Sequence, residues 1–173
     1  MHGQDLDSLK VASFYQYYEN EQYEQAIELG TELHNVTGAV SKDNEDYLKI
    51  ISNLADCHYN CGNTYKAIEL DTQALELSKK FFGETHPSYA NALNDLAVYY
   101  SDLGDYGKAI ELGTQAMETR KRLLGEEHPL FVISLDNLAY YYSEIEDYEK
   151  AIEFGTQVLE IRKKYWVKST LIT

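Results

Sequence analysis

The chain has 173 residues, 44% of them hydrophobic, which is enough for one ordinary domain with a substantial buried core. Its formal net charge is -14, from 29 acidic and 15 basic residues. This charge repels phosphate backbones and anionic lipids, so we expect neither nucleic acid nor a membrane as a partner. The amino terminus is not of the signal-peptide type, and no apolar run approaches the ~18 residues needed to cross a bilayer. We therefore expect a soluble, cytoplasmic protein, and two cysteines in that setting do not predict a disulfide framework.

A repeat with a period of 42 residues dominates the sequence. The segment that begins at His86, HPSYANALNDLAVYYSDLGDYGKAIELGTQAM, aligns without a gap with HPLFVISLDNLAYYYSEIEDYEKAIEFGTQVL, which begins at His128. A third copy begins at Asn44, and a weaker one includes QYEQAIELGTEL. The expected repeats span about 3–43, 44–85, 86–127 and 128–168, followed by a short tail over 169–173. We expect them to form a single domain over residues 1–173.

The first copy departs from the other three. Ser13 and Phe14 stand where the others have leucine and alanine. Gly38 to Lys42 predicts a loop where the others continue into a basic helix end. Because the terminal repeat of a stack has one side in water, such differences indicate a capping unit.

The second copy contains Cys57, His58 and Cys61, which at first resemble a metal or thiol site. The repeat aligns Cys57 and His58 with tyrosines, and it aligns Cys61 with Leu103 and Ile145. Since buried thiols behave as small hydrophobic groups, we expect these residues to pack in the core. Metal binding is the alternative.

The third copy shows the two helices of each repeat most clearly. One apolar stripe has the spacing i, i+3, i+4, i+7 and consists of Leu93, Leu96, Ala97 and Tyr100. The second stripe consists of Ala109, Ile110, Ala116 and Met117. Gly104 and Asp105 between them suit a tight turn. Neither helix can bury its stripe alone, so the pairs are expected to pack antiparallel and stack.

The boundaries between repeats carry helix-capping signals. Arg120, Lys121 and Arg122 end the second helix of the third copy, where basic residues offset the helix dipole. Gly125 is expected to adopt the left-handed cap conformation. His86 and His128 each precede a proline at a first helical turn. Their recurrence predicts a structural role, capping or packing, rather than catalysis.

Glycine recurs inside the second helix at Gly30, Gly113 and Gly155. Glycine costs about 1 kcal/mol relative to alanine in a helix interior, so its recurrence requires an explanation. We expect either that a side chain such as Tyr99 or Tyr141 fills the space or that two backbones approach closely. A ligand pocket is the alternative.

The third copy resembles a tetratricopeptide repeat (TPR) in its pattern L-A-x-x-Y, then G-x-Y-x-x-A, then A. The residues are Leu96, Ala97, Tyr100, Gly104, Tyr106, Ala109 and Ala116. The period and the segments LLGEEHP and NLA resemble the kinesin light chain type. This resemblance implies an all-α fold, a right-handed α-solenoid of four TPR helix-turn-helix repeats, and a protein-interaction scaffold. No phosphate loop, nucleophile elbow or zinc-ligand spacing is present, so we expect neither an enzyme nor a cofactor.

The family binds peptides or partner helices along the concave face formed by its first helices. The helical phase opposite the Leu96 and Tyr100 stripe predicts which residues lie there. They are Tyr15, Tyr18, Lys49, Ser52, Asn53, Asp56, Tyr59, Asn91, Asn94, Asp95, Val98, Asp136, Asn137 and Tyr140, with Val11, Ser101, Ile133 and Ser143 at the same phase. Asparagine can clamp a peptide backbone, and tyrosine supplies flat apolar contact. An ordinary solvated face is the alternative reading of each residue.

Aspartates outnumber lysines on this face, so a basic or neutral partner segment is expected rather than an acidic one. The acidic-tryptophan peptides of the kinesin light chain groove are not carried over, because Lys49 is the only basic residue there. The runner-up function is a structural, regulatory or self-association segment of a larger protein. It is motivated by the apolar residues Tyr165, Trp166, Val167, Leu171 and Ile172 at the carboxyl end.

Overall fold

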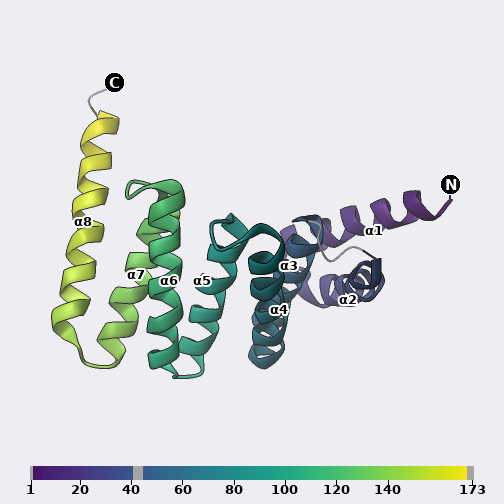
Figure 1. Ribbon diagram of the computed structural model, residues 1–173, viewed down its shortest axis with the longest axis horizontal. Helices are drawn as coiled ribbons and strands as arrows, with labels where there is room; N and C mark the ends of the chain where they lie inside the picture. Colours follow the sequence, from purple (N-terminus) through teal and green to yellow (C-terminus); the bar gives the residue numbers. More distant parts are fainter. Residues whose placement is uncertain (1, 41–44, 171–173) are drawn as a thin grey trace. The chain divides into compact units, whose positions relative to one another are not determined.

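The computed structural model describes residues 2–40 and 45–170, and the side chains of residues 8–36 and 45–164. The apolar side chains behind the self-association hypothesis, from Tyr165 onward, lie outside that range. Within it the chain forms eight α-helices and no strand, which confirms the predicted all-α class (Figure 1). The helices are α1 (His2–Glu19), α2 (Tyr23–Val40), α3 (Glu45–Asn60), α4 (Thr64–Phe82), α5 (Pro87–Asp102), α6 (Tyr106–Leu124), α7 (Pro129–Glu144) and α8 (Tyr148–Thr170).

One boundary prediction is wrong. The loop expected from Gly38 does not begin there, because α2 continues to Val40. A single glycine weakens a helix by about 1 kcal/mol but does not end it. The rest of the expected loop, residues 41–44, lies outside the described part of the chain.

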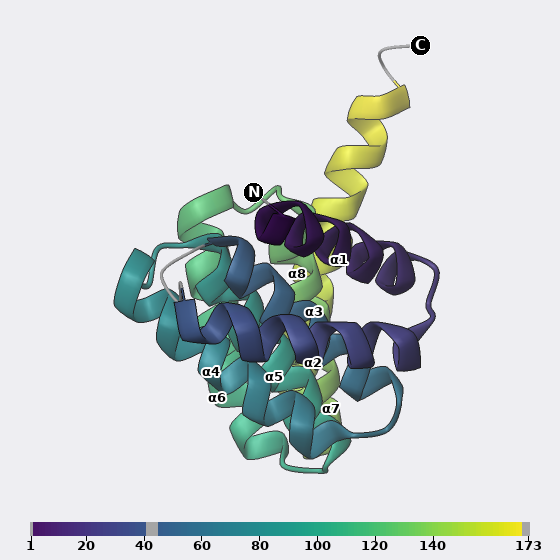
Figure 2. The ribbon, with the colours of Figure 1, turned by 90° about the vertical axis from the view of Figure 1, so that its right-hand side faces the viewer.

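The chain divides into two compact units, residues 1–92 and 93–173, with α5 contributing to both. In the first unit, α1 and α2 form one antiparallel pair and α3 and α4 form the next (Figure 2). Its core includes Phe14, Leu48, Ile51, Leu54 and Leu70. In the second unit, α7 packs against both α6 and α8. Phe131, Val132, Leu135 and Val158 form the centre of its core, and Met117, Phe154 and Ile161 pack around them.

The turn within each helix pair has one residue with positive φ at an equivalent position. In the middle copies it is a glycine, Gly62 or Gly104, each at φ 78°. In the first and last copies it is Glu21 at 57° or Glu146 at 62°. This conformation is unfavourable for residues with a Cβ atom, so packing of the two helices enforces the turn geometry even where the residue does not favour it.

At the repeat boundaries the histidine caps are confirmed, whereas the glycines have the expected positive φ but ψ angles of 170° (Gly83) and 167° (Gly125), so they do not form the predicted left-handed cap. Gly83 and Gly125 have φ angles of 85° and 83°, and the Gly125 N–H donates to the Lys121 carbonyl. His128 Nδ1 accepts a hydrogen bond from the Leu130 N–H at 3.2 Å. His86 Nδ1 accepts from the N–H two residues further on at 3.3 Å, and the His86 ring packs on Phe82 with centroids 4.7 Å apart. His86 and His128 therefore each have a structural role, as caps at equivalent helix starts.

Overpacking at Ala97 tests how closely the helices approach. Ala97 is 1% exposed, whereas Ala139, its equivalent 42 residues later, is half-buried. We expect Ala97→Leu to lower the free energy of unfolding by about 1–3 kcal/mol, because the added atoms have no free space. Ala139→Leu should have a clearly smaller effect. Urea denaturation of both variants measures this, and equal losses would contradict the assignment of Ala97 to a tight contact.

None of the described helices combines the length and apolarity needed to cross a membrane.

Candidate partner-binding surfaces

The fourteen residues predicted to bind a partner are all half-buried or exposed. We call their surfaces the first-helix faces: α1, α3 and the start of α5 in the first unit, and α7 and the rest of α5 in the second. Ser101, placed at the same phase by the sequence, is 6% exposed and so offers no surface contact. Helical phase alone misplaces it because a neighbouring element covers that side of the helix.

Tyr18 and Asp56 join α1 to α3 on the first-helix face of the first unit. The Tyr18 hydroxyl donates a hydrogen bond to Asp56 Oδ2 at 3.0 Å. Burial, followed by the Asp56 charge, raises the pKa of Tyr18, so the phenol stays protonated and can keep donating. This contact confirms that predicted residues 38 positions apart lie side by side.

Lys49, the one basic residue predicted on this face, is occupied by neighbouring carboxylates. Its Nζ lies 3.2 Å from Glu45 and 3.9 Å from Asp46. The hydrogen bond to Glu45 is the main cause that raises the pKa of Lys49. Burial and then Asp46 raise the pKa of Tyr15 nearby. The surroundings of Lys49 are thus acidic overall.

In the second unit, Asn94 and Asn137 belong to a hydrogen-bond cluster around a buried arginine. Arg120 is 4% exposed. Its Nη1 donates to Asn94 Oδ1 at 2.8 Å, to Ser134 Oγ at 2.9 Å and to the Leu130 carbonyl at 3.2 Å. The Asn137 amide also donates to Asn94 Oδ1, at 3.3 Å. The asparagines predicted to clamp a peptide therefore also hold α5, α6 and α7 together.

Sequence reasoning missed the role of Arg120. It is not a solvated residue that offsets the helix dipole, because its side chain turns inward toward the two first helices. Burial lowers the pKa of its guanidinium group, partly compensated by the charge of Asp95. One signal in the sequence was Ser78, which occupies the equivalent position 42 residues earlier. A position that takes either serine or arginine is not explained by charge at a solvent-exposed helix end alone.

Tyr140 offers the most exposed aromatic surface among the predicted residues, at 51%. Its ring meets that of Tyr106 edge to face, with centroids 6.4 Å apart. The Tyr106 hydroxyl donates to Glu144 Oε2 at 2.9 Å, which is the main cause that raises the pKa of Tyr106 to about 12. The result is an aromatic surface bordered by a carboxylate, which suits a partner side chain that is apolar or cationic.

The packing interpretation of the second copy is confirmed for Cys57 alone. Cys57 is fully buried, and burial raises the pKa of its thiol to about 12. His58 and Cys61 are half-buried. Among the described residues, no group of three or more histidine, cysteine or acidic side chains is arranged to hold a metal ion.

Two of the helix-interior glycines are covered by side chains from the next first helix. A Cβ atom on Gly113 would lie 3.3 Å from both Leu138 and Tyr141. This confirms that Tyr141 fills the space. A Cβ on Gly30 would lie 3.0 Å from Leu54 and 2.7 Å from Phe14, the bulky residue of its own repeat. Gly113 therefore forms a socket for the following repeat, whereas the space at Gly30 is filled by Phe14 of its own repeat together with Leu54 of the next.

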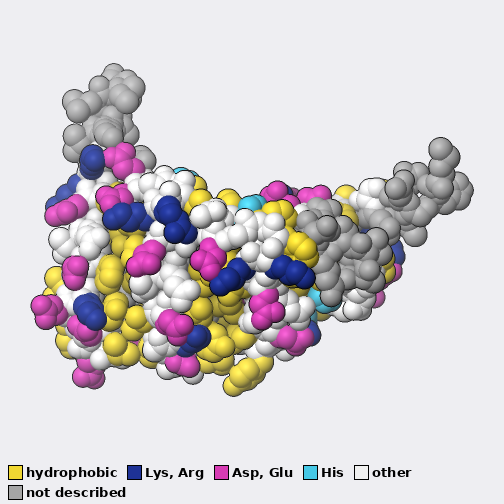
Figure 3. All heavy atoms as spheres, viewed as in Figure 1, with side chains coloured by type: hydrophobic (Ala, Val, Ile, Leu, Met, Phe, Trp, Pro, Cys, Tyr) yellow, Lys and Arg dark blue, Asp and Glu magenta, His cyan; other side chains and the backbone are white. Residues whose placement is uncertain are grey.

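Antiparallel helix pairs that recur every 42 residues, with glycine sockets between them, define a helical-repeat interaction scaffold. Acidic side chains are distributed along the surface of these helices in Figure 3. The chain belongs to the tetratricopeptide repeat family, whose family model matches residues 46–122 and 104–164.

Solved structures support the kinesin light chain-like type. The nearly identical TPR-like repeats of a Podospora anserina kinesin light chain protein are 25% identical in sequence, with a TM-score of 0.80. That match covers 95% of this chain and 78% of the other. BtubC from P. vanneervenii, at 20% identity and TM-score 0.68 over 91% of this chain and 74% of the other, shows the fold alone. No curated protein matches by sequence.

A more distant structure shows the same fold. A Rap protein complexed with Competence and Sporulation Factor matches with a TM-score of 0.76 at 15% identity, over 93% of this chain and 44% of the other.

Proposed function

We propose that this chain is a non-enzymatic TPR scaffold, acting as one domain over residues 1–173, that binds an extended peptide or partner segment along its first-helix faces. The observation that carries the proposal is the pairing of predicted residues across successive first helices. Tyr18 meets Asp56 between α1 and α3, and Asn94 meets Asn137 between α5 and α7. Each face is therefore a surface continuous across two repeats, as binding of an extended segment requires.

The chemistry of these faces favours a basic or neutral segment. Asp56 and Asp95 lie on them. Three cations at these faces are already engaged: Lys49 by carboxylates, Arg120 by the asparagine cluster and Arg162 by Asp136. Tyr140 supplies an exposed ring next to the Glu144 carboxylate. An acidic segment would meet like charge, which is unfavourable for association.

The asparagines on these faces differ in how many side-chain hydrogen-bonding groups remain available to a partner. Asn137 donates to Asn94, whereas Asn53 makes no side-chain hydrogen bond to any other described residue. Asn53 therefore keeps its donor and its acceptor for a peptide backbone. We expect Asn53 and Tyr140 to contribute more to binding than to stability.

Affinity capture tests the proposal. The immobilised chain is incubated with cell lysate beside the variant Asn53→Ala/Tyr140→Ala, with Tyr65→Ala as matched control. Tyr65 is 78% exposed and lies on a second helix, α4. We expect a protein that the wild type and Tyr65→Ala retain and that the double variant loses by about tenfold or more, equal to about 1.4 kcal/mol.

Circular dichroism must first show equal helical content in the three proteins. The captured protein is then represented by overlapping peptides, and a basic or neutral peptide should bind with the same dependence on Asn53 and Tyr140. Equal retention by all three proteins would place binding elsewhere. Selective binding of acidic peptides would contradict the expected charge preference.

A further inference from the structure

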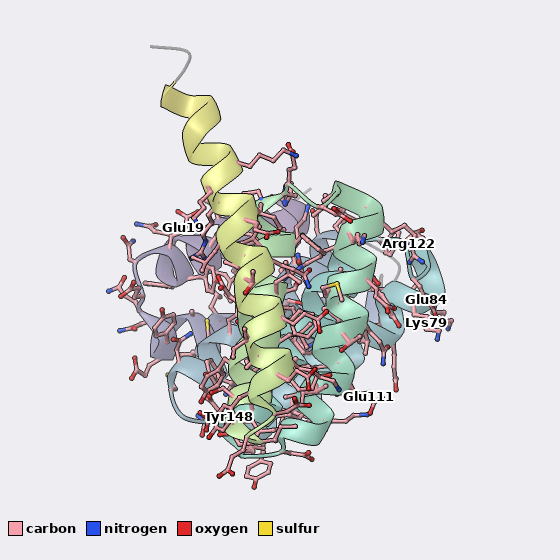
Figure 4. All side chains as sticks on the ribbon, turned by 90° about the vertical axis from the view of Figure 1, so that its left-hand side faces the viewer. Glu19, Lys79, Glu84, Glu111, Arg122 and Tyr148 are labelled. Carbon is pink, nitrogen blue, oxygen red and sulfur yellow. The ribbon has the colours of Figure 1, made fainter. Side chains whose placement is uncertain are left out.

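The face of α8 that points away from α7 carries large apolar side chains in the open. Ile152 is 68% exposed and Leu159 is 57% exposed. Between them, nothing lies within 4 Å of the position that a Cβ of Gly155 would take. Figure 4 looks onto α8, which stands in front of the other helices of its unit, with Tyr148 in its first turn. We call Ile152, Gly155, Leu159 and Arg162 the α8 outer face.

The same surface on α6, 42 residues earlier, is covered by α7. Ile110, Gly113, Met117 and Arg120 are the equivalent residues. Gly113 receives Leu138 and Tyr141, and Met117 packs on the cluster that includes Phe131 and Leu135. The structure thus shows which side chains fill such a face.

Arg120 and Arg162 differ in the same way. Both contact the equivalent residue of their own repeat: Arg120 binds Asn94, and Arg162 forms an ion pair with Asp136. Arg120 continues to Ser134 Oγ and the Leu130 carbonyl on the next first helix, and it is buried. The Arg162 side chain is 60% exposed. Arg162 is thus exposed where Arg120 is buried under the next first helix.

We propose that the α8 outer face is a docking site for an amphipathic helix of another protein, with the pattern aromatic-x-x-Ser-Leu-x-x-Leu-x-x-Tyr seen in α7 from Phe131 to Tyr141. The second leucine and the tyrosine of this pattern fill the Gly155 socket. The first aromatic residue and the first leucine pack on Leu159, and the serine hydroxyl accepts a hydrogen bond from Arg162. The site borders the first-helix face of α7 at Asp136 but uses neither Asn53 nor Tyr140, so its test is distinct from the test of the proposed peptide binding.

A second copy of this chain does not supply the required helix. α3 and α7 already pack against their neighbouring helices, and α5 buries Leu93 and Leu96. α1 has Ser13 and Gln16 at the positions where α7 has Leu138 and Tyr141, so it lacks both groups that fill the socket. The net charge of -14 also opposes self-association.

A neighbouring groove extends the site. Pro129, Val132, Ile133, Ile161 and Arg162, with Glu127 at the rim, line a space of about 250 Å³. Because almost all of its lining surface is hydrocarbon, it can take an apolar side chain from the start of the docked helix, beside the Arg162 guanidinium.

NMR titration of the full chain tests the proposal. The probe is a synthetic peptide of residues 128–144, held helical by a hydrocarbon staple between positions 136 and 143, which lie on the side of α7 away from Leu138 and Tyr141. Circular dichroism confirms its helicity. We expect saturable shifts of the Gly155 amide signal and none at Gly113, whose socket is filled. Gly155→Leu should weaken binding by about tenfold or more, and so should Leu138→Ala in the peptide.

Gly107→Leu is the matched control, because Gly107 is an exposed helical glycine on α6, away from α8. It should bind the peptide like the wild type. The proposal is overturned if the helical peptide does not bind, if the Gly113 signal responds instead, or if Gly155→Leu binds unchanged. Sedimentation of the chain alone should show a monomer. A dimer that Gly155→Leu dissociates would show that a second copy is the occupant and also overturn the proposal.

Discussion

Arg120→Ala is expected to lower the free energy of unfolding by about 2–4 kcal/mol. The change removes a buried guanidinium that joins three helices, and it leaves the buried Ser134 hydroxyl and the half-buried Asn94 carbonyl without this donor. Urea denaturation followed by circular dichroism measures the loss. A loss below about 1 kcal/mol would mean that water replaces the arginine at little cost.

Arg162→Ala provides the matched control. Arg162 occupies the equivalent position in the last copy, but its ion pair with Asp136 is exposed to solvent. Such surface pairs contribute about 0–1 kcal/mol, so its loss should be small. Equal effects of the two substitutions would contradict the structural role assigned to Arg120.

Leu138→Ala should destabilise the chain by about 3 kcal/mol or more, since Leu138 is fully buried and its removal leaves a cavity over Gly113. Gly113→Leu alone should cost about 1–3 kcal/mol, because its side chain meets Leu138 and Tyr141. Combined, the two changes should cost at least about 1 kcal/mol less than their sum, since the new leucine can occupy the cavity. Thermal and urea melts of the four proteins measure the coupling.

Leu159→Ala is the control for this cycle. Leu159 is 57% exposed, so its truncation removes little buried apolar surface. It should change the free energy of unfolding by under about 1 kcal/mol. Strict additivity of Leu138→Ala and Gly113→Leu would show that the two residues do not share one space, contrary to the geometry of the socket.

The sequence predicts local structure in this chain well because the signals are repeated. Two histidines before two prolines indicate caps, and both accept the expected backbone hydrogen bond. A glycine after the basic helix end predicts a positive φ, and Gly125 has one, although its ψ of 167° is extended. The socket at Gly113 also follows from sequence, since an otherwise unfavourable glycine needs a neighbour such as Tyr141.

Side-chain pairing between helices is less predictable. Helical phase places Asn94 and Asn137 on one surface, but it does not reveal that they bond to each other and to Arg120. That cluster depends on rotamers and on the distance between three helices, which no local pattern encodes. Charge and position alone suggested a solvated Arg120, because the partners that bury it lie 14 and 26 residues away.

The contacts between helices also bear on how the chain folds. In the first unit α1 packs on α2, α2 on α3 and α3 on α4; in the second, α6 packs on α7 and α7 on α8. Each of these contacts closes a loop of only a few residues between consecutive helices, so little chain entropy is lost before a contact forms. Such low contact order favours rapid folding that begins locally and spreads to the adjacent pair. Duplication of a 42-residue segment adds only nearest-neighbour interfaces, which explains how so similar a unit could be copied along one chain.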